Sequence, residues 1–373
     1  MERRSFIKHT GLAGILAAGS APAFAQGSPS IKWRCASSFP KSLDTIYGAA
    51  EVAAKTVNDV TGGKFQIQVF AAGEIVPGLQ VADAVQNGTV ECGHTAPYYY
   101  VGKDPTFAFG TAIPFGLNQR QYDAWWFYGG GEQLFNDFLK SYNITSLLCG
   151  NTGAQMGGWY RKEIKSVADL KGMKMRIGGF AGQVLTKLGV VPQQIAGGDI
   201  YPSLEKGTID AAEWVGPYDD EKLGFNKVAK FYYYPGWWEG GPALHIFANT
   251  PKYNELPAEY KAALLAGAHA GNTHMMAKYD AQNPGALRKL AAAGTQLRPF
   301  PRPVMDACYN AAMELYAETS AKNAAFKKIY DSMLAFQKEQ ILWFRVTENT
   351  YDNYMATAGQ QPAGKGAAPA KKS

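Results

Sequence analysis

The segments IKWRCAS at residues 31–37 and FQIQVF at residues 65–70 alternate apolar and polar side chains, which predicts two β-strands. Between them, residues 41–60 place apolar side chains at helical spacing, and this stretch ends at Gly62-Gly63. A strand, a helix and a second strand in this order are typical of a βαβ unit with parallel strands. The chain has 373 residues, which at about 150 residues per domain suggests two domains.

The same alternation of elements continues to about residue 250, and a second set begins near residue 151. We therefore expect an α/β protein built mainly on parallel strands. The further strands are expected at residues 90–94, 144–149, 174–177, 190–195, 209–214 and 243–248, and the helices at residues 79–87, 119–142 (interrupted by glycines at 129–131) and 181–188.

The last third of the chain, from Leu256, is predicted to be mostly helical, with breaks near Pro284 and at the proline-rich residues 299–303. Residues 325–355 have apolar side chains at helical spacing and are predicted to form one long helix. The tail, residues 358–373, is rich in Ala, Gly, Pro and Lys and is expected to be disordered.

The N-terminus has the features of an export signal. Paired arginines in ERRSFIK at residues 2–8 precede a weakly hydrophobic Gly/Ala-rich stretch, and AFA at residues 23–25 matches a signal-peptidase site. This pattern predicts a twin-arginine signal peptide at residues 1–25 and a periplasmic mature protein. An N-terminal membrane anchor is the alternative. No later apolar run approaches the ~20 residues needed to cross a bilayer.

Four cysteines, at residues 35, 92, 149 and 308, form no CxxC pair, which argues against thiolate metal sites. The first three lie in apolar, strand-like segments, where a thiol behaves as a small hydrophobic group. We expect free core cysteines, with a disulfide as the alternative in an oxidising compartment.

The composition excludes several classes of function. The net charge of +6 is spread along the chain, so no nucleic-acid partner is expected. No GxSxG, GxxxxGK[ST] or HExxH motif occurs, and His94 and His245 lie in apolar strands, where core histidines are commoner than catalytic bases. No enzyme activity is expected.

Two polar positions stand out because each lies at the end of a predicted strand. Arg176 precedes Gly178-Gly179, where its guanidinium can receive a carboxylate in the crevice of an open sheet. Glu213 and Trp214 precede a Gly-Pro turn, and Glu213 can either neutralise Arg176 or bind a cation through oxygen. An ordinary surface ion pair is the alternative for Arg176.

Four segments together resemble the periplasmic solute-binding subunits of TRAP transporters, and most of all the branch that binds 2-oxo acids and related monocarboxylates. The similarity extends to about residue 357. The segments are ECGHTAPYYYVGKDPTFAFG at residues 91–110, MKMRIGG at 173–179, DAAEWVGPYDD at 210–220 and KFYYYPGWWEGGPALHIFAN at 230–249.

The resemblance implies a two-domain periplasmic-binding-protein clamp with strands that cross between the domains. Its first domain is expected at residues 28–150 plus about 243–290. Its second domain is expected at residues 151–242 plus about 291–325. A C-terminal helix at residues 326–357 is implied to hold a homodimer together, with a packing strut of a monomer as the alternative.

The resemblance also assigns the site. Arg176 is implied to pair with the ligand's carboxylate, and Tyr99, Tyr100, Gln155 and Trp214 to contact the ligand. The cation is implied to be Na⁺, with Ca²⁺ as the alternative, because residue types alone do not choose between these hard ions. Its implied ligands are the side chains of Gln155, Glu213 and Glu239 and the backbone oxygen of Trp214.

The function implied is an extracytoplasmic receptor that delivers a pyruvate-like 2-oxo acid to a TRAP permease in the membrane. The alternatives are a receptor for dicarboxylates or for 2-hydroxy acids such as lactate, and a binding protein coupled to a sensor. A metal-dependent enzyme acting on keto acids is less favoured, because the sequence offers no convincing general base.

Overall fold

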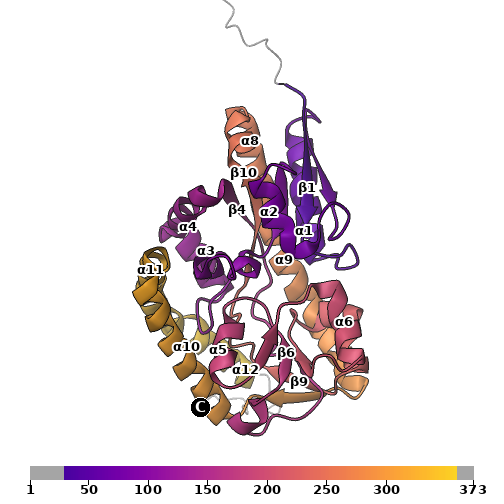
Figure 1. The fold of residues 1–373 in the computed structure, drawn as a ribbon, viewed down its shortest axis with the longest axis vertical. Coiled ribbons are helices and arrows are strands. Elements are labelled where there is room, and N and C mark those ends of the chain that lie inside the picture. Colours follow the sequence, from indigo (N-terminus) through magenta and orange to yellow (C-terminus); the bar gives the residue numbers. More distant parts are fainter. Residues whose placement is uncertain (1–28, 359–373) are drawn as a thin grey trace, which may run out of the picture.

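The computed structural model describes residues 29–358, so the predicted signal peptide and all but the first residue of the predicted disordered tail lie outside the described residues. The described chain forms two lobes, each built around one sheet (Figure 1). No helix in this part of the chain is both long enough and apolar enough to span a bilayer.

The first sheet has five strands in the order β2-β1-β3-β10-β4. β1 pairs in parallel with β2 and β3, as the βαβ pattern predicted, whereas β10 runs antiparallel to both of its neighbours. The strands are β1 Ile31–Ser37, β2 Phe65–Phe70, β3 Cys92–Thr95, β4 Ile144–Asn151 and β10 Ala243–Asn249.

The second sheet has six short strands in the order β11-β9-β5-β8-β6-β7, and β5 is antiparallel to both neighbours. The prediction of mainly parallel pairing is therefore only partly correct, because strands entering from the other lobe run against their neighbours. The strands are β5 Trp159–Tyr160, β6 Lys174–Arg176, β7 Val191–Gln193, β8 Ala211–Ala212, β9 Phe231–Tyr234 and β11 Gln296–Pro299.

Helices cover both sheets. Those of the first lobe are α1 Ile46–Val60, α2 Val81–Gln86, α3 Gln119–Tyr128, α4 Gly131–Leu139 and α8 Thr250–Glu255. Those of the second are α5 Ala181–Lys187, α6 Gly197–Glu205, α7 Pro217–Leu223 and α10 Arg302–Lys322. Short 3-10 helices occupy residues 78–80, 97–100, 105–110, 140–142, 167–170 and 225–227.

The chain crosses between the lobes at three places. After β4 it enters the second sheet, after β9 it returns to the first, and helix α9, Ala258–Ala292, packs on α1 and β4 in one lobe and on α7 in the other (Figure 1). The two crossing loops run side by side, since the amide of Gln155 donates to the carbonyl of Glu239 (3.2 Å) and that of Gly236 to Gln155 (2.9 Å). Strand β10, which follows the second crossing, pairs with β3 and β4 in the first sheet.

Helix α9 does not break at Pro284, so that prediction is wrong. Pro284 and Asp280, whose carbonyl loses its helical donor, are both exposed, and water can satisfy the freed carbonyl. Helix α9 packs closely on α1 at Gly271, where there is no room for a side chain: a Cβ would lie 2.8 Å from the carbonyl oxygen of Ala49.

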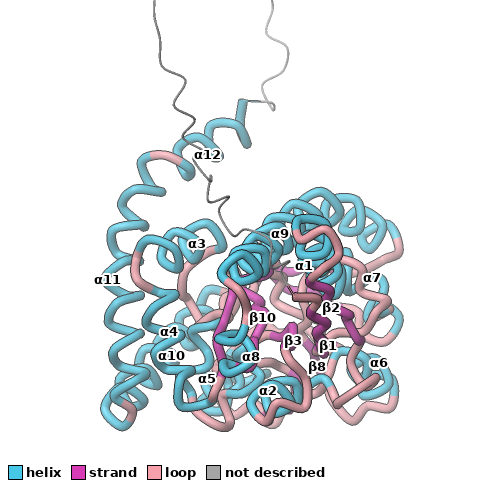
Figure 2. Tube along the Cα trace, turned by 90° about the horizontal axis from the view of Figure 1, so that it is seen from above, coloured by secondary structure: helices cyan, strands magenta, loops and turns pink. Residues whose placement is uncertain are grey.

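The predicted C-terminal helix is two helices, α11 Ala324–Val346 and α12 Glu348–Ala358, separated by Thr347. Phe326, Ile329 and Met333 bury the first half of α11, whereas α12 has no buried residue and projects from the body (Figure 2). Large apolar side chains are exposed along this projection: Ile341, Leu342, Trp343, Val346, Tyr351, Tyr354 and Met355.

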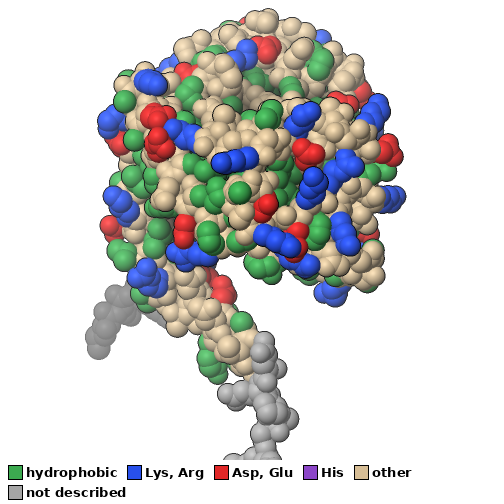
Figure 3. Space-filling model, turned by 60° about the horizontal axis from the view of Figure 1, so that its bottom comes forward, with side chains coloured by type: hydrophobic (Ala, Val, Ile, Leu, Met, Phe, Trp, Pro, Cys, Tyr) green, Lys and Arg blue, Asp and Glu red, His purple; other side chains and the backbone are tan. Residues whose placement is uncertain are grey.

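Two further predictions are confirmed within the described residues. All four cysteines are buried and unpaired, and His94 and His245 are fully buried in the first sheet. On the face of the molecule in Figure 3, basic and acidic side chains are interspersed, so no continuous basic stripe crosses it.

Candidate functional site

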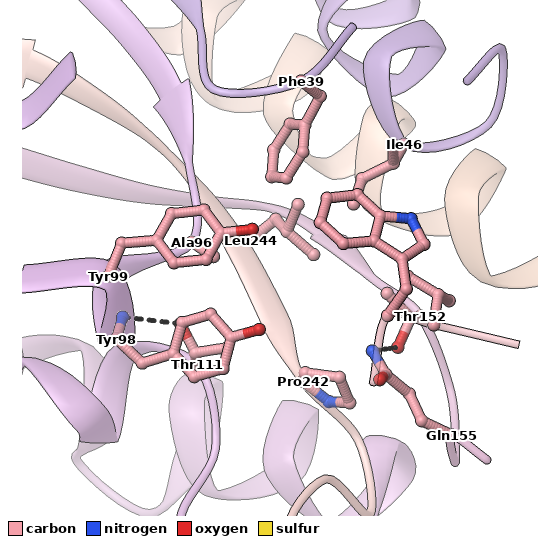
Figure 4. A pocket seen from close by; sticks show the side chains of 12 residues that line it. Phe39, Ile46, Ala96, Tyr98, Tyr99, Thr111, Thr152, Gln155, Pro242 and Leu244 are labelled. Atoms are coloured by element: carbon pink, nitrogen blue, oxygen red, sulfur yellow. Dashed lines mark hydrogen bonds between the residues drawn. The ribbon is translucent and has the colours of Figure 1, made fainter. Parts of the chain in front are cut away.

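A small cavity lies between the lobes, next to the two crossing loops. The volume open to the centre of a water molecule is about 20 Å³, little more than the ~10–15 Å³ that one water requires. The walls are mostly apolar, and they come from both lobes (Figure 4). The cavity is lined by Phe39, Ile46, Ala96, Tyr98, Tyr99, Thr111, Thr152, Gln155, Trp214, Val215, Pro242 and Leu244.

Two tyrosines contribute from the first lobe. Tyr98 and Tyr99 lie on the turn Pro97–Tyr100 after β3, and both hydroxyls point into the cavity (Figure 4). The turn is held by the amide of Tyr98, which donates to the Thr111 hydroxyl (3.1 Å). Burial raises the pKa of both phenols, so both stay protonated and can act as hydrogen-bond donors.

Tyr100, expected beside the ligand, points into the core of the first lobe instead. Its hydroxyl pairs with that of Thr95 (2.8 Å) and accepts from the amide of Ala82 (3.1 Å). Tyr98 lies at the cavity in its place. The run of three tyrosines was the available signal, but the geometry of the 3-10 turn decides which rings face the cavity.

Arg176 ends β6 and is fully buried. Its Nε donates to the carbonyl of Ile195 (3.0 Å), and its Nη1 donates to the carbonyl (2.7 Å) and the carboxylate of Glu213. The guanidinium lies 5.0 Å from the ring centre of Trp214, a cation–π contact. Burial opposes the charge most strongly of any single influence, but the combined attraction of Glu213, Tyr99, Tyr98 and Glu239 is larger, so the pKa of Arg176 is raised. Its Nη2 has no partner among the described residues.

Two buried carboxyl groups adjoin this guanidinium. Glu213 accepts from Arg176 and from the amide of Gly178 (2.8 Å) through Oε1. Burial raises the pKa of Glu213 despite the opposing charge of Arg176, and burial together with repulsion from Glu213 raises the pKa of Glu239 well above its usual value. With both carboxyls ionised the site would carry one more negative than positive charge, and the raised pKa values reflect that missing countercharge as well as burial.

Three oxygens near the cavity accept no hydrogen bond from the described residues: Oε1 of Gln155, Oε2 of Glu213 and Oε2 of Glu239. The Gln155 amide nitrogen donates to the Thr152 hydroxyl (3.0 Å), which leaves its oxygen available. Unpaired amide and carboxyl oxygens that lie together fit a hard cation such as Na⁺ or Ca²⁺. Residues 29–358 contain no group of three or more His, Cys, Asp or Glu side chains arranged to hold a metal, so such a site depends on amide or backbone oxygens as well.

The structure thus brings Tyr99, Gln155 and Trp214 to the cavity wall and places Arg176 and Glu213 directly behind Trp214. Glu239 joins them through the hydrogen-bonded crossing loops. Sequence reasoning expected an apolar wall from Trp214 and nearby tyrosines but missed Phe39, Ile46 and Leu244. These residues carry no distinctive motif, and the packing of the two lobes alone brings them together.

The sequence matches the model of bacterial extracellular solute-binding protein family 7 over residues 36–323. A monocarboxylate 2-oxoacid-binding periplasmic protein of Nostoc sp. is 51% identical over 332 residues, which cover 89% of this chain and 91% of that protein.

Two solved structures are also similar. A TRAP transporter solute-binding protein of Bordetella bronchiseptica, a dimer with calcium and picolinate in one active site, is 55% identical (TM-score 0.88) over 89% of this chain and 99% of its own. A TRAP periplasmic solute-binding protein of Pseudoalteromonas atlantica with bound sodium and pyruvate is 38% identical (TM-score 0.85) over 87% of this chain and 99% of its own.

The two-lobed fold, the cavity between the lobes and these matches agree. The family consists of transport receptors and not of enzymes. The chain therefore belongs to bacterial extracellular solute-binding protein family 7, the periplasmic receptors of TRAP transporters.

Proposed function

We propose that the cavity binds a small 2-oxo monocarboxylate such as pyruvate, together with a cation. The observation that carries this proposal is the set of unpaired polar atoms: one guanidinium nitrogen of Arg176 and one oxygen each of Gln155, Glu213 and Glu239. Buried polar atoms without partners are costly, so a protein retains them where a ligand completes them. The 2-oxo acid and pyruvate ligands of two similar proteins support the same class.

In this proposal Arg176 receives the carboxylate through its unpaired Nη2, and its other nitrogens hold it rigidly to Ile195 and Glu213. Tyr99 donates from the opposite lobe, with Tyr98 beside it. When bound, the cation supplies positive charge that orients the ligand's carboxylate and oxo oxygens. Its protein ligands would be the side chains of Gln155, Glu213 and Glu239 and the backbone oxygen of Trp214.

Charge balance bears on the identity of the cation. With Arg176 protonated and both Glu213 and Glu239 ionised, the protein groups carry one excess negative charge. A monovalent ion neutralises the protein groups alone, whereas a divalent ion also neutralises a bound monocarboxylate. We propose Na⁺ or Ca²⁺, in keeping with the sodium and the calcium bound in the two similar structures.

Cavity shape favours a short ligand. About 20 Å³ is open to a water centre, and the apolar side of the cavity is closed by Phe39, Ile46 and Leu244. A methyl group fits this wall, whereas a second carboxylate placed there would lose its hydration without gaining a partner. This argument favours pyruvate over a dicarboxylate such as succinate.

The lobes are proposed to open and close about the crossing loops, with domain boundaries near residues 150/151 and 242/243 and a third crossing in α9. The closed form would be presented to a TRAP permease in the membrane.

We further propose that residues 1–25 direct export through the twin-arginine pathway. The exposed apolar side chains of α11 and α12 would pair two copies in a homodimer, and the similar Bordetella structure is also a dimer.

Calorimetric titration of the mature protein tests the ligand and the cation. Pyruvate should bind tightly with Na⁺ or Ca²⁺ present and weakly after chelation and replacement of Na⁺, while succinate should bind poorly. Lactate and longer 2-oxo acids measure how closely the wall fits the ligand. Binding of succinate alone would instead indicate a dicarboxylate receptor.

Substitution of Arg176 tests the carboxylate pair. Arg176→Lys keeps the charge that compensates Glu213 but loses the planar fork, so pyruvate affinity should fall roughly 10- to 100-fold. Lys187→Arg, on the exposed end of α5, is the matched control and should bind as the wild type does. Unchanged affinity in Arg176→Lys would contradict the proposed role.

A further inference from the structure

One group of contacts joins the lobes at a distance from the proposed ligand contacts. Residues 38–45 connect β1 to α1 in the first lobe, although the sequence predicted a helix from residue 41. Helix α7 begins in the second lobe directly after the cavity residues Trp214 and Val215. These two segments come from different sheets and meet across the gap between the lobes.

Asp44 supplies the polar contacts described here from the first-lobe side. Its carboxylate forms an ion pair with Lys222 of α7 through Oδ1. Through Oδ2 it accepts from the hydroxyl of Tyr218, also on α7 (3.3 Å), and from Lys278 of α9 (2.8 Å). Lys278 also donates to the backbone carbonyl of Asp44 (2.9 Å), so both the side chain and the loop are held.

The α7 side of this contact is also held by interactions that do not involve Asp44. The Lys222 ammonium lies 3.9 Å from the ring centre of Tyr218, and the amide of Tyr218 donates to the side chain of Asn283 on α9 (3.0 Å). Both donors are therefore held on one helix face at the position that the Asp44 carboxylate occupies. Lys222 and Lys278 lower the pKa of Asp44 to about 2 against the opposing effect of its partial burial, so the carboxylate stays ionised at physiological pH.

The same segments also build the cavity wall. Phe39 and Ile46, which flank Asp44 in the sequence, line the cavity from the first lobe, and Trp214 and Val215 precede α7 on the other side. The ring of Phe39 lies 6.4 Å from that of Trp214. If the lobes separate so that α7 moves away from residues 38–45, the Asp44 contacts break and the cavity wall opens at the same time.

We propose that Asp44, Lys222 and Tyr218 form an inter-lobe latch that holds the receptor closed and sets the rate at which the ligand leaves. The part of this inference that concerns ligand release rests on the proposed function. The latch touches no proposed ligand or cation contact, so its residues act as positioning residues. Contacts made only in the closed state shift the opening equilibrium and slow release, with little effect on encounter.

The expected effect is moderate because the contact is partly solvated. The exposed fractions of the side chains are 48% for Asp44, 30% for Lys222 and 26% for Lys278. Exposed ion pairs are individually weak and are screened by salt, but here one carboxylate meets two ammonium groups. We expect Asp44→Asn or Lys222→Met to raise the dissociation rate of pyruvate roughly three- to tenfold, with the smaller effect at high salt.

Stopped-flow measurement of pyruvate binding and release by the full mature protein tests the latch. The double variant Asp44→Asn/Lys222→Met should release pyruvate hardly faster than Asp44→Asn alone, because the loss of Asp44 already removes the contact with Lys222. Asp83→Asn is the matched control, since its ion pair with Lys103 is similarly exposed but lies within the first lobe. Wild-type dissociation rates in both single variants, or an equal effect of Asp83→Asn, would overturn the proposal.

A second measurement does not depend on the identity of the ligand. Fluorophores placed on the two lobes report the closed fraction by single-molecule energy transfer in ligand-free protein. Asp44→Asn should lower the ratio of closed to open molecules by the same three- to tenfold factor. If wild-type protein fails to bind pyruvate, the proposed function fails, and this ratio still decides the latch: an unchanged ratio overturns it.

Discussion

Gly178 is the position at which a single added methyl group should interfere with closure alone. It follows β6 in the second lobe, and an added Cβ would lie 2.8 Å from Cζ and 2.9 Å from the hydroxyl oxygen of Tyr98 in the first lobe. The backbone of Gly178 lies outside the left-handed region, so alanine is allowed there when the lobes are apart. Gly178→Ala therefore perturbs a contact that exists only when the lobes are together.

The size of the effect follows from overpacking. Forcing a methyl group into a filled space typically costs about 1–3 kcal/mol. Since ~1.4 kcal/mol corresponds to a factor of ten, ligand affinity should fall by about 5- to 150-fold. The ring of Tyr98 cannot retreat freely, because its amide is bonded to Thr111 and its ring packs 5.1 Å from that of Tyr99.

Two measurements separate closure from folding. Calorimetric titration with pyruvate at fixed cation concentration should give the weakened affinity, and thermal unfolding of the ligand-free protein should give a nearly unchanged midpoint. Gly198→Ala is the control, because a Cβ at Gly198 has no atom within 4 Å. This reasoning would be refuted if Gly178→Ala bound pyruvate with wild-type affinity. It would also be refuted if the substitution lowered the thermal unfolding midpoint of the ligand-free protein as much as that of the ligand-bound protein.

Three further predictions concern charge, pH and assembly. Glu239→Gln should abolish the stabilisation that Na⁺ or Ca²⁺ gives in thermal unfolding. It should not lower the unfolding midpoint measured without cation, because it removes a buried carboxyl whose pKa is raised by burial and by Glu213. Burial lowers the pKa of His94 to about 3 from an unfolded value of 6.5. The contribution of the neutral imidazole to the free energy of unfolding is therefore complete above pH 6.5 and is lost as the pH falls towards 3. Denaturant unfolding should therefore show that wild type loses about 2 kcal/mol relative to His94→Leu between pH 7 and pH 5, and equal pH slopes would contradict this. Trp343→Ser should shift the protein from dimer to monomer in light scattering without changing pyruvate affinity, and a wild-type dimer would argue against the helix interface.

Local patterns predicted most of the elements and some of the site. The strands Ile31–Ser37 and Phe65–Phe70 have the predicted bounds, because period-two alternation on a half-buried surface leaves a strong signal. Arg176, Glu213 and Trp214 lie together as expected, since strand ends of one sheet share an edge. The free core cysteines were likewise predictable from their apolar surroundings.

Tertiary structure decided what depends on contacts between distant segments. Strand Gln296–Pro299 has no pattern of its own and exists because it pairs with Phe231–Tyr234. Helix α9 continues through Pro284 because that turn faces water and both ends of the helix are packed. Neither fact is visible in a local window of sequence.

The sequence by itself determined the family, the α/β elements and the chemistry of the charged groups, because these depend on residue types at short spacing. Tertiary structure alone decided that Tyr98 and not Tyr100 faces the cavity, and that Asp44 meets Lys222. The physical reason is the same in both cases. The direction of a side chain and its partner across a gap depend on how two separately folded sheets pack together, and packing is a property of the whole chain.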